Sequence, residues 1–304
     1  MLSASPPTDP FMKKPSLTEA CQCSSLTCDG AMGTQLIQLG MQLDECGMLW
    51  NAERPDDIKS VHQAYRSAGC RLITTNSFGG SRSMLERHGL GDKVAEWNRR
   101  AAQLAGEVAG PDGWVIGDVG PFGDFLEPLG DTTPEELEEI FREQISALVE
   151  GGADAILVET MSDPAELCVG IRAARAVTEL PVIATYAFQK SAGEYRTMMG
   201  TKVAAAITAA YDAGASIAGA NCGTDLSLAD YLELAKEIVA AADGRPTILQ
   251  PNAGAPRQVD AEVHYDATPA DMAELTSQLR ALGISIVGGC CGTSPAHLAA
   301  MAKV

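Results

Sequence analysis

The chain has 304 residues, of which 46% are hydrophobic and 20% are charged, and its formal net charge is −18. This composition is typical of a folded globular protein and excludes wholesale disorder. The negative charge argues against binding to nucleic acid or to an anionic membrane surface, because both depend on clustered Lys and Arg.

The first 18 residues contain four prolines and little hydrophobic periodicity. We predict a mobile tail over 1–18 and a single domain over 19–304. The tail lacks the apolar core of a secretory signal, and the longest apolar stretch, Val203 to Cys222, is too polar to cross a bilayer. Because the nine cysteines come without an export signal, we expect reduced thiols and a cytoplasmic location.

Short apolar runs alternate with amphipathic helical patterns along the rest of the chain. Near-continuous apolar runs are typical of parallel strands that are buried on both faces. The predicted strands are Ser25–Asp29, Leu72–Asn76, Trp114–Val119, Ala155–Glu159, Val182–Tyr186, Ser216–Cys222, Thr247–Pro251 and Ser285–Cys290.

Helix boundaries are marked between these strands. A capping side chain followed by proline predicts helix starts at Thr133, Asp163, Thr268 and Ser294. Glycines after helical runs predict left-handed caps at helix ends, at Gly69, Gly151, Gly214 and Gly283. Strands that alternate with helices through short connections favour an α/β fold, a (β/α)₈ TIM barrel, with a doubly wound open sheet as the alternative.

In such a barrel, functional residues gather where the strands end. The residues at or just after the predicted strand ends are polar, sulfur-bearing or glycine: Asp29-Gly30, Asn76, Gly120-Pro121, Glu159, Asn221-Cys222, Asn252 and Cys290-Cys291.

The cysteines at these ends predict a metal site. Cys222 ends the sixth strand and Cys290-Cys291 the eighth, so their ends lie about 10 Å apart at ~4.8 Å per strand. Thiolates favour zinc, and three protein ligands with an open position are typical of a catalytic site. The neighbouring glycines allow both consecutive cysteines to reach one ion. Alone, Cys222 would more simply be a small buried residue, and a vicinal disulfide would be strained.

Six short runs stand out at the predicted strand ends and turns. They are Asp29-Gly30-Ala31-Met32-Gly33-Thr34, Thr74-Thr75-Asn76-Ser77-Phe78, Glu159-Thr160, Asn221-Cys222-Gly223, Pro251-Asn252-Ala253-Gly254 and Gly288-Gly289-Cys290-Cys291-Gly292-Thr293. These runs resemble those of the zinc-dependent homocysteine S-methyltransferase family, and in particular the homocysteine-binding module of cobalamin-dependent methionine synthases. The resemblance extends from about Cys21 to the C-terminus.

The resemblance implies a TIM barrel that binds Zn²⁺ and methylates the thiol of homocysteine to give methionine. The implied metal ligands are Cys222, Cys290 and Cys291, with Asn252 as a displaceable fourth ligand. The implied substrate contacts are Asp29 and Glu159 for the amino group and the N–H groups of Gly30 and Ala31 for the carboxylate. We include Asn76 among the substrate-binding residues.

The methyl donor is the open part of this interpretation. None of the four histidines lies in the Asp-x-His-x-x-Gly pattern of a cobalamin-binding module, and the long C-terminal extension of betaine-using relatives is absent. We therefore expect a methyl-corrinoid on a separate protein, with residues 123–128 as a hypothetical partner or donor surface.

Four alternatives stay open. The chain could use a small sulfonium or betaine donor, or methylate a different thiol. It could instead hold structural or storage zinc in a barrel that serves as an interaction module. A generic barrel lyase based on Glu159 is the weakest alternative, because no predicted strand ends in a lysine.

Overall fold

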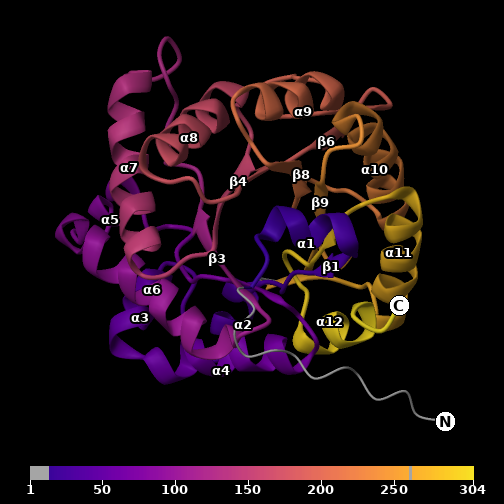
Figure 1. The fold of residues 1–304 in the computed structure, drawn as a ribbon, viewed down its shortest axis with the longest axis horizontal. Coiled ribbons are helices and arrows are strands. Elements are labelled where there is room, and N and C mark those ends of the chain that lie inside the picture. The colour runs from indigo at the N-terminus through magenta and orange to yellow at the C-terminus, as the bar shows by residue number, and fades with distance from the viewer. Residues whose placement is uncertain (1–13, 260–261) are drawn as a thin grey trace.

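Eight parallel strands form a barrel in the computed structural model of the chain (Figure 1). The structure describes residues 14–259 and 262–304. Hydrogen bonds join neighbouring strands in the order β1, β12, β9, β8, β5, β4, β3, β2. The ring closes where Cys28, just after β1, pairs with Leu72 of β2. This closure confirms the predicted TIM barrel and excludes the open sheet.

All eight predicted strands are present, although several are shorter than predicted. The strands β1 and β12 stop before their predicted ends. The strand β4 instead continues beyond Glu159, with a register shift between Val158 and Met161. The bounds are β1 Leu26–Thr27, β2 Leu72–Thr74, β3 Trp114–Val119, β4 Ala155–Met161, β5 Val182–Tyr186, β8 Ile217–Asn221, β9 Thr247–Gln250 and β12 Ile286–Val287.

Helices follow the strands along the chain and surround the barrel (Figure 1). Short 3₁₀ turns, η1 Gly47–Leu49 and η2 Gly91–Lys93, lie in the connections. The helices are α1 Leu17–Cys23, α2 Met32–Gln38, α3 Trp50–Glu53, α4 Pro55–Ser67, α5 Arg82–Glu86, α6 Val94–Ala109, α7 Pro134–Glu150, α8 Pro164–Val177, α9 Val203–Asp212, α10 Leu228–Ala242, α11 Pro269–Leu282 and α12 Pro295–Met301. Within the described ranges, no helix has the length and apolar character needed to span a membrane.

The helix α1 closes the N-terminal end of the barrel. Figure 1 shows it in the middle of the ring of strands. Its buried residues Leu17 and Ala20 belong to the same apolar cluster as the inward-facing strand residues, such as Leu72 and Ile286. The preceding Lys14 forms an ion pair with Asp154 at 2.7 Å. The apolar side chains of α1 therefore fill the N-terminal end of the barrel.

Most of the predicted tail lies outside the described residues, which begin at Lys14. The predicted domain boundary at residue 19 falls inside α1, because the helix begins at Leu17 after a capping box formed by Ser16 and Glu19. Leu17 is only 1% exposed. The fold therefore includes residues 17 and 18, which the sequence pattern assigned to the tail.

The predicted helix starts are confirmed, with proline at the first helical position in each case. Of the predicted left-handed caps, Gly69, Gly214 and Gly283 have φ near +100°. The prediction for Gly151 is wrong, because Gly151 has φ −74° and continues the helical hydrogen bonding. Its neighbour Gly152, with φ +99°, takes the left-handed position.

Two short antiparallel hairpins were not predicted. One pairs β6 (Gln189–Ser191) with β7 (Glu194–Arg196), and the other pairs β10 (Arg257–Val259) with β11 (Glu262–His264). They follow β5 and β9 respectively, at the end of the barrel where the strands terminate. Both hairpins are therefore additions to the rim of the barrel, outside its eight-stranded sheet.

Candidate metal and substrate site

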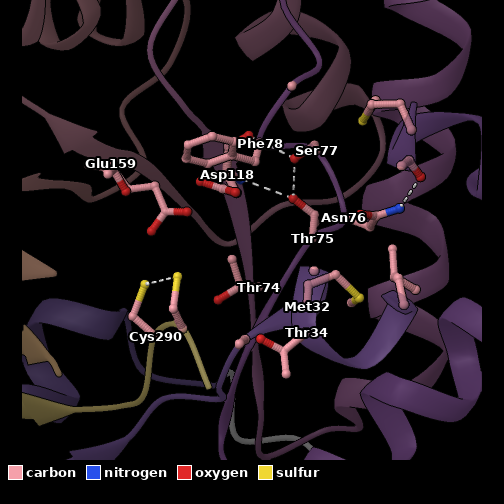
Figure 2. A pocket seen from close by; sticks show the side chains of 18 of the residues that line it. Met32, Thr34, Thr74, Thr75, Asn76, Ser77, Phe78, Asp118, Glu159 and Cys290 are labelled. Atoms are coloured by element: carbon pink, nitrogen blue, oxygen red, sulfur yellow. Dashed lines mark hydrogen bonds between the residues drawn. The ribbon is translucent and has the colours of Figure 1, made fainter. Parts of the chain in front are cut away.

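A cavity of about 530 Å³ lies at the C-terminal end of the barrel. Figure 2 shows its wall, with Glu159 and Asp118 on the side that faces Cys290. The predicted site residues that line it are Asp29, Gly30, Ala31, Asn76, Glu159, Cys222, Cys290 and Cys291. The barrel thus brings together residues that are far apart in the sequence.

Three of these residues form a sulfur cluster. The Sγ atoms of Cys222, Cys290 and Cys291 all lie within 4.8 Å of one another. The Cys222–Cys291 and Cys290–Cys291 distances are both 4.0 Å. Two sulfurs on one tetrahedral zinc at ~2.3 Å lie about 3.8 Å apart, so these spacings suit a zinc ion. Among the described residues, no other group of metal-binding side chains comes together in this way.

The backbone around the cluster is unusual. Cys222 has φ +52°, a conformation that side chains other than glycine rarely adopt, and it directly follows β8. A Cβ atom on Gly289 would lie 2.5 Å from Thr293 Oγ1. Only glycine therefore fits the turn that lets the two adjacent cysteines after it reach the cluster.

Hydrogen bonds within the cluster favour a thiolate at one of its sulfurs. Hydrogen bonds from Cys290 and Cys291 lower the pKa of Cys222 to about 3. The same contacts with Cys222 raise the pKa of Cys290 well above its usual value. The contacts among the three sulfurs therefore favour a thiolate at Cys222, and a divalent cation would favour loss of the remaining protons.

Asn252 lies beside the cluster but not on the cavity wall. Its side chain hydrogen-bonds Cys222, and its Nδ2 also donates to Gly223 O at 3.3 Å. Its Oδ1 is buried, and the described part of the chain offers it no hydrogen-bond partner. A buried amide oxygen without a partner, on a side chain that contacts Cys222, suits the fourth position of a metal site.

The two predicted acids both face the cavity. Asp29 is 3% exposed, and its two carboxylate oxygens accept hydrogen bonds from the N–H and the hydroxyl of Thr74, each at 2.7 Å. Burial raises the pKa of Asp29 to about 7. Glu159 accepts a hydrogen bond from Asn221 Nδ2 at 3.0 Å, and loss of water contacts raises its pKa to about 7.

A third acid, Asp118, was not predicted. It lines the same cavity, is 3% exposed, and shares a hydrogen bond with Glu159. Burial and the adjacent Glu159 raise the pKa of Asp118 well above its usual value. Its position was readable in the sequence, since it is an ionisable residue in the otherwise apolar and glycine run Trp114–Val119. The described cavity wall contains no Lys or Arg, so it is suited to an ammonium group.

Three of the predicted substrate residues have other partners in the structure. The Ala31 N–H donates to Thr293 Oγ1 at 3.1 Å, so this N–H group already has a hydrogen-bond partner other than a substrate carboxylate. Gly30 packs closely against the same threonine. Asn76 donates from Nδ2 to Gly47 O at 2.8 Å and to Asn51 Oδ1 at 3.2 Å. Asn76 therefore anchors the turn at 47–51 while its side chain lines the cavity.

Comparison with known proteins gives consistent results. The model of the family "Homocysteine S-methyltransferase" matches residues 26–304. The methionine synthase of Mycobacterium tuberculosis (strain ATCC 25618 / H37Rv) is 34% identical over 288 residues, which is 89% of this chain and 24% of that protein. The methionine synthase of Mycobacterium leprae (strain TN) is 32% identical over 289 residues, 89% of this chain and 23% of that protein. The chain thus spans about a quarter of the length of these relatives.

A solved structure shares the fold. The homocysteine methyltransferase MmuM from Escherichia coli, in its metallated form, superimposes with a TM-score of 0.74 at 22% sequence identity. The match covers 92% of this chain and 96% of that protein.

Proposed function

The chain belongs to the homocysteine S-methyltransferase family, and on this premise we propose that it is a zinc-dependent enzyme that methylates homocysteine to methionine. The observation that carries the proposal is the cluster of Cys222, Cys290 and Cys291 on one wall of a cavity whose other wall carries carboxyl groups. A sulfur site facing an acidic wall suits a molecule with a thiol at one end and an ammonium group at the other.

The metal ligands would be the three cysteines, with Asn252 in the fourth position until the substrate thiol arrives. The Sγ spacing and the unpartnered Asn252 Oδ1 support this assignment. When bound, zinc would supply the positive charge that keeps the substrate sulfur deprotonated and nucleophilic at neutral pH.

The acidic residues would bind and orient the substrate. Glu159 and Asp29 would hold the ammonium group, and hydrogen bonds between charged groups contribute about 1.5–3 kcal/mol each. A substrate fixed at its ammonium end would present its thiol to the sulfur cluster. Its sulfur lone pair then forms the new S–CH₃ bond as the bond between the methyl group and its donor breaks, and the donor keeps that electron pair.

We propose a methyl-corrinoid as donor, carried by a separate protein. The cavity lies at the C-terminal end of the barrel, where loops carry exposed apolar side chains, including Phe125 at 44%, Leu129 at 66% and Met198 at 59% exposure. Residues 123–128 belong to these loops. Exposed apolar groups that lie together on a surface, as Phe125 and Met198 do beside a second, smaller pocket, are typical of surfaces that contact another protein.

Metal content and methyl transfer test the proposal together. We expect about one zinc per chain, and we expect Cys290→Ser to lose both zinc and methylation of homocysteine. Cys168→Ala, far from the cluster in the sequence and on helix α8, should lose neither. Zinc-loaded protein that does not methylate homocysteine with any donor would contradict the function, and would favour a structural zinc site.

The donor is tested separately. Purified protein is given homocysteine and either a methyl-corrinoid protein, S-methylmethionine, S-adenosylmethionine or betaine, and methionine is measured. Turnover with the corrinoid protein alone supports the proposal. Turnover with a free sulfonium or with betaine, in the absence of a corrinoid protein, would overturn the choice of donor. Faster turnover with a thiol other than homocysteine would overturn the choice of acceptor.

A further inference from the structure

The buried side-chain amide of Asn221 contacts both a proposed substrate-binding residue, Glu159, and a proposed metal ligand, Cys290. Asn221 is the last residue of β8, immediately before Cys222, and it is 2% exposed. The sequence placed it at a strand end without a role. We propose that Asn221 is a positioning residue that fixes the Glu159 carboxylate and the Cys290 sulfur relative to each other. This inference rests on the proposed function, and it assigns the residue that sets the geometry of that site.

The orientation of the amide is fixed by two donors. Asn221 Oδ1 accepts a hydrogen bond from the Thr185 hydroxyl at 2.8 Å and another from the Thr160 N–H at 3.0 Å. Both donors lie on the neighbouring part of the barrel, Thr185 in β5 and Thr160 in β4. Because the oxygen is held on this side, Nδ2 must point in the other direction.

The donor side of the amide faces the site. Asn221 Nδ2 lies 3.0 Å from Glu159 Oε2 and 2.6 Å from Thr160 Oγ1. It also lies 3.9 Å from Cys290 Sγ, within the range of a hydrogen bond to sulfur. The same nitrogen therefore contacts the group proposed to bind the ammonium and one of the sulfurs proposed to bind the metal.

The backbone on both sides of this amide is strained. Thr160 has φ +61° and Cys222 has φ +52°. Such a conformation at a residue other than glycine persists only where its surroundings hold it, and it is most unfavourable at a β-branched residue. Asn221 contacts both the N–H and the hydroxyl of Thr160, and Cys222 is the next residue along the chain. The amide is thus placed to hold both turns.

Two consequences follow. Hydrogen bonds from outside groups to metal ligands change metal affinity by about 10–100-fold, so loss of the amide should weaken zinc binding. A mispositioned Glu159 should weaken binding of homocysteine by about 10–100-fold, the equivalent of one hydrogen bond to a charged group. The mispositioned Glu159 should have little effect on the binding of a thiol that has no ammonium group.

The experiment measures these two effects without methyl transfer. Zinc affinity is measured by competition with a chelator, and calorimetry gives the affinity of the zinc-loaded protein for homocysteine and for 4-mercaptobutanoate, which lacks the amino group. For Asn221→Ser and Asn221→Asp we expect weaker zinc binding and reduced discrimination between the two thiols. Thr185→Val, which removes only the hydroxyl that orients the amide, should show the same changes to a smaller degree. Thr185→Ser should restore both properties.

A matched control is available at the other end of the barrel. Thr247 is also a buried strand threonine, at the start of β9, and its hydroxyl has no partner in the described structure. Thr247→Val should leave zinc affinity and thiol discrimination unchanged. The inference is overturned if Asn221→Asp and Thr185→Val keep wild-type zinc affinity and wild-type discrimination, or if the two thiols lose affinity equally. A wild-type chain that binds neither zinc nor homocysteine would instead overturn the proposed function, and with it this inference.

Discussion

Asp118 and Glu159 share a hydrogen bond on the cavity wall, although they lie on different strands, β3 and β4. Burial and the neighbouring acid raise the pKa of Asp118 well above its usual value, which favours the protonated carboxyl as the donor to Glu159. The hydrogen bond from Asp118 also lowers the pKa of Glu159, against the loss of water contacts that raises it to about 7. The pair therefore keeps one negative charge available for an ammonium group.

Asp118→Asn and Asp118→Ala should differ in their effect on homocysteine. Asparagine keeps a donor toward Glu159, so we expect nearly wild-type affinity. Alanine removes the donor, which raises the pKa of Glu159 further and leaves more of it protonated at pH 7. We expect affinity to fall about tenfold, equivalent to ~1.4 kcal/mol. The loss should shrink as the pH rises, and calorimetry between pH 6.5 and pH 8.5 measures it. Equal losses in both variants at every pH would contradict this account.

Glu159→Gln should specifically weaken the use of homocysteine. The substitution keeps the shape of the side chain and removes its charge, so about 1.5–3 kcal/mol of ammonium binding is lost. We expect kcat/KM for homocysteine to fall about 10–100-fold, with zinc content unchanged. A thiol without an amino group should be methylated as well by the variant as by the wild type. A parallel loss for both thiols would show that Glu159 does not bind the ammonium.

Mild oxidation should release the metal reversibly. Cys222 Sγ and Cys291 Sγ lie 4.0 Å apart, so oxidation of the ligand sulfurs can join them once zinc leaves. We expect hydrogen peroxide to release zinc and to abolish activity over the same time course. Reductant with added zinc should restore both the zinc content and the activity. A colorimetric zinc indicator follows the release. Cys168→Ala should show the same time course, whereas inactivation with retained zinc would contradict the assignment of the ligands.

His62 should weaken the fold at acid pH. It is fully buried on α4, both ring nitrogens lack partners in the described residues, and burial lowers its pKa from 6.5 to about 4. Between these values the unfolded chain binds more protons than the folded one, so the free energy of unfolding decreases as the pH falls from 6.5 to 4. The full loss is about 3 kcal/mol.

His62→Leu should remove that part of the acid dependence. Urea unfolding at several pH values measures it, and the exposed His88→Gln is the matched control. An unchanged pH dependence in His62→Leu would show that this histidine does not account for it.

Much of the architecture could be predicted from local patterns. Runs such as Val182–Tyr186 are largely apolar because a barrel strand is buried on both faces, and this pattern can be recognised without knowing which strands lie beside it. The sulfur cluster was predictable for a similar reason, since Cys222 and Cys290 follow strands whose order in the barrel is fixed by the chain order.

The details of the site depend on contacts between strands, which local patterns do not specify. The role proposed for Asn221 depends on Thr160 and Thr185, which are 61 and 36 residues away. The hydrogen bond between Ala31 and Thr293 spans 262 residues. The left-handed position falls at Gly152 instead of Gly151 because the helix makes one further hydrogen bond before it ends. Residue preferences alone do not predict that bond.

The helix α1 fills the N-terminal end of the barrel, where Leu17 and Ala20 lie in the apolar cluster. The cavity lies at the opposite end, so its ligands reach it past the loops of the C-terminal rim. If the proposed corrinoid protein covers that rim, homocysteine has to bind before the donor protein docks, and methionine can leave only after it dissociates. Under the proposed function, dissociation of the donor protein is then a step able to limit the rate of every turnover.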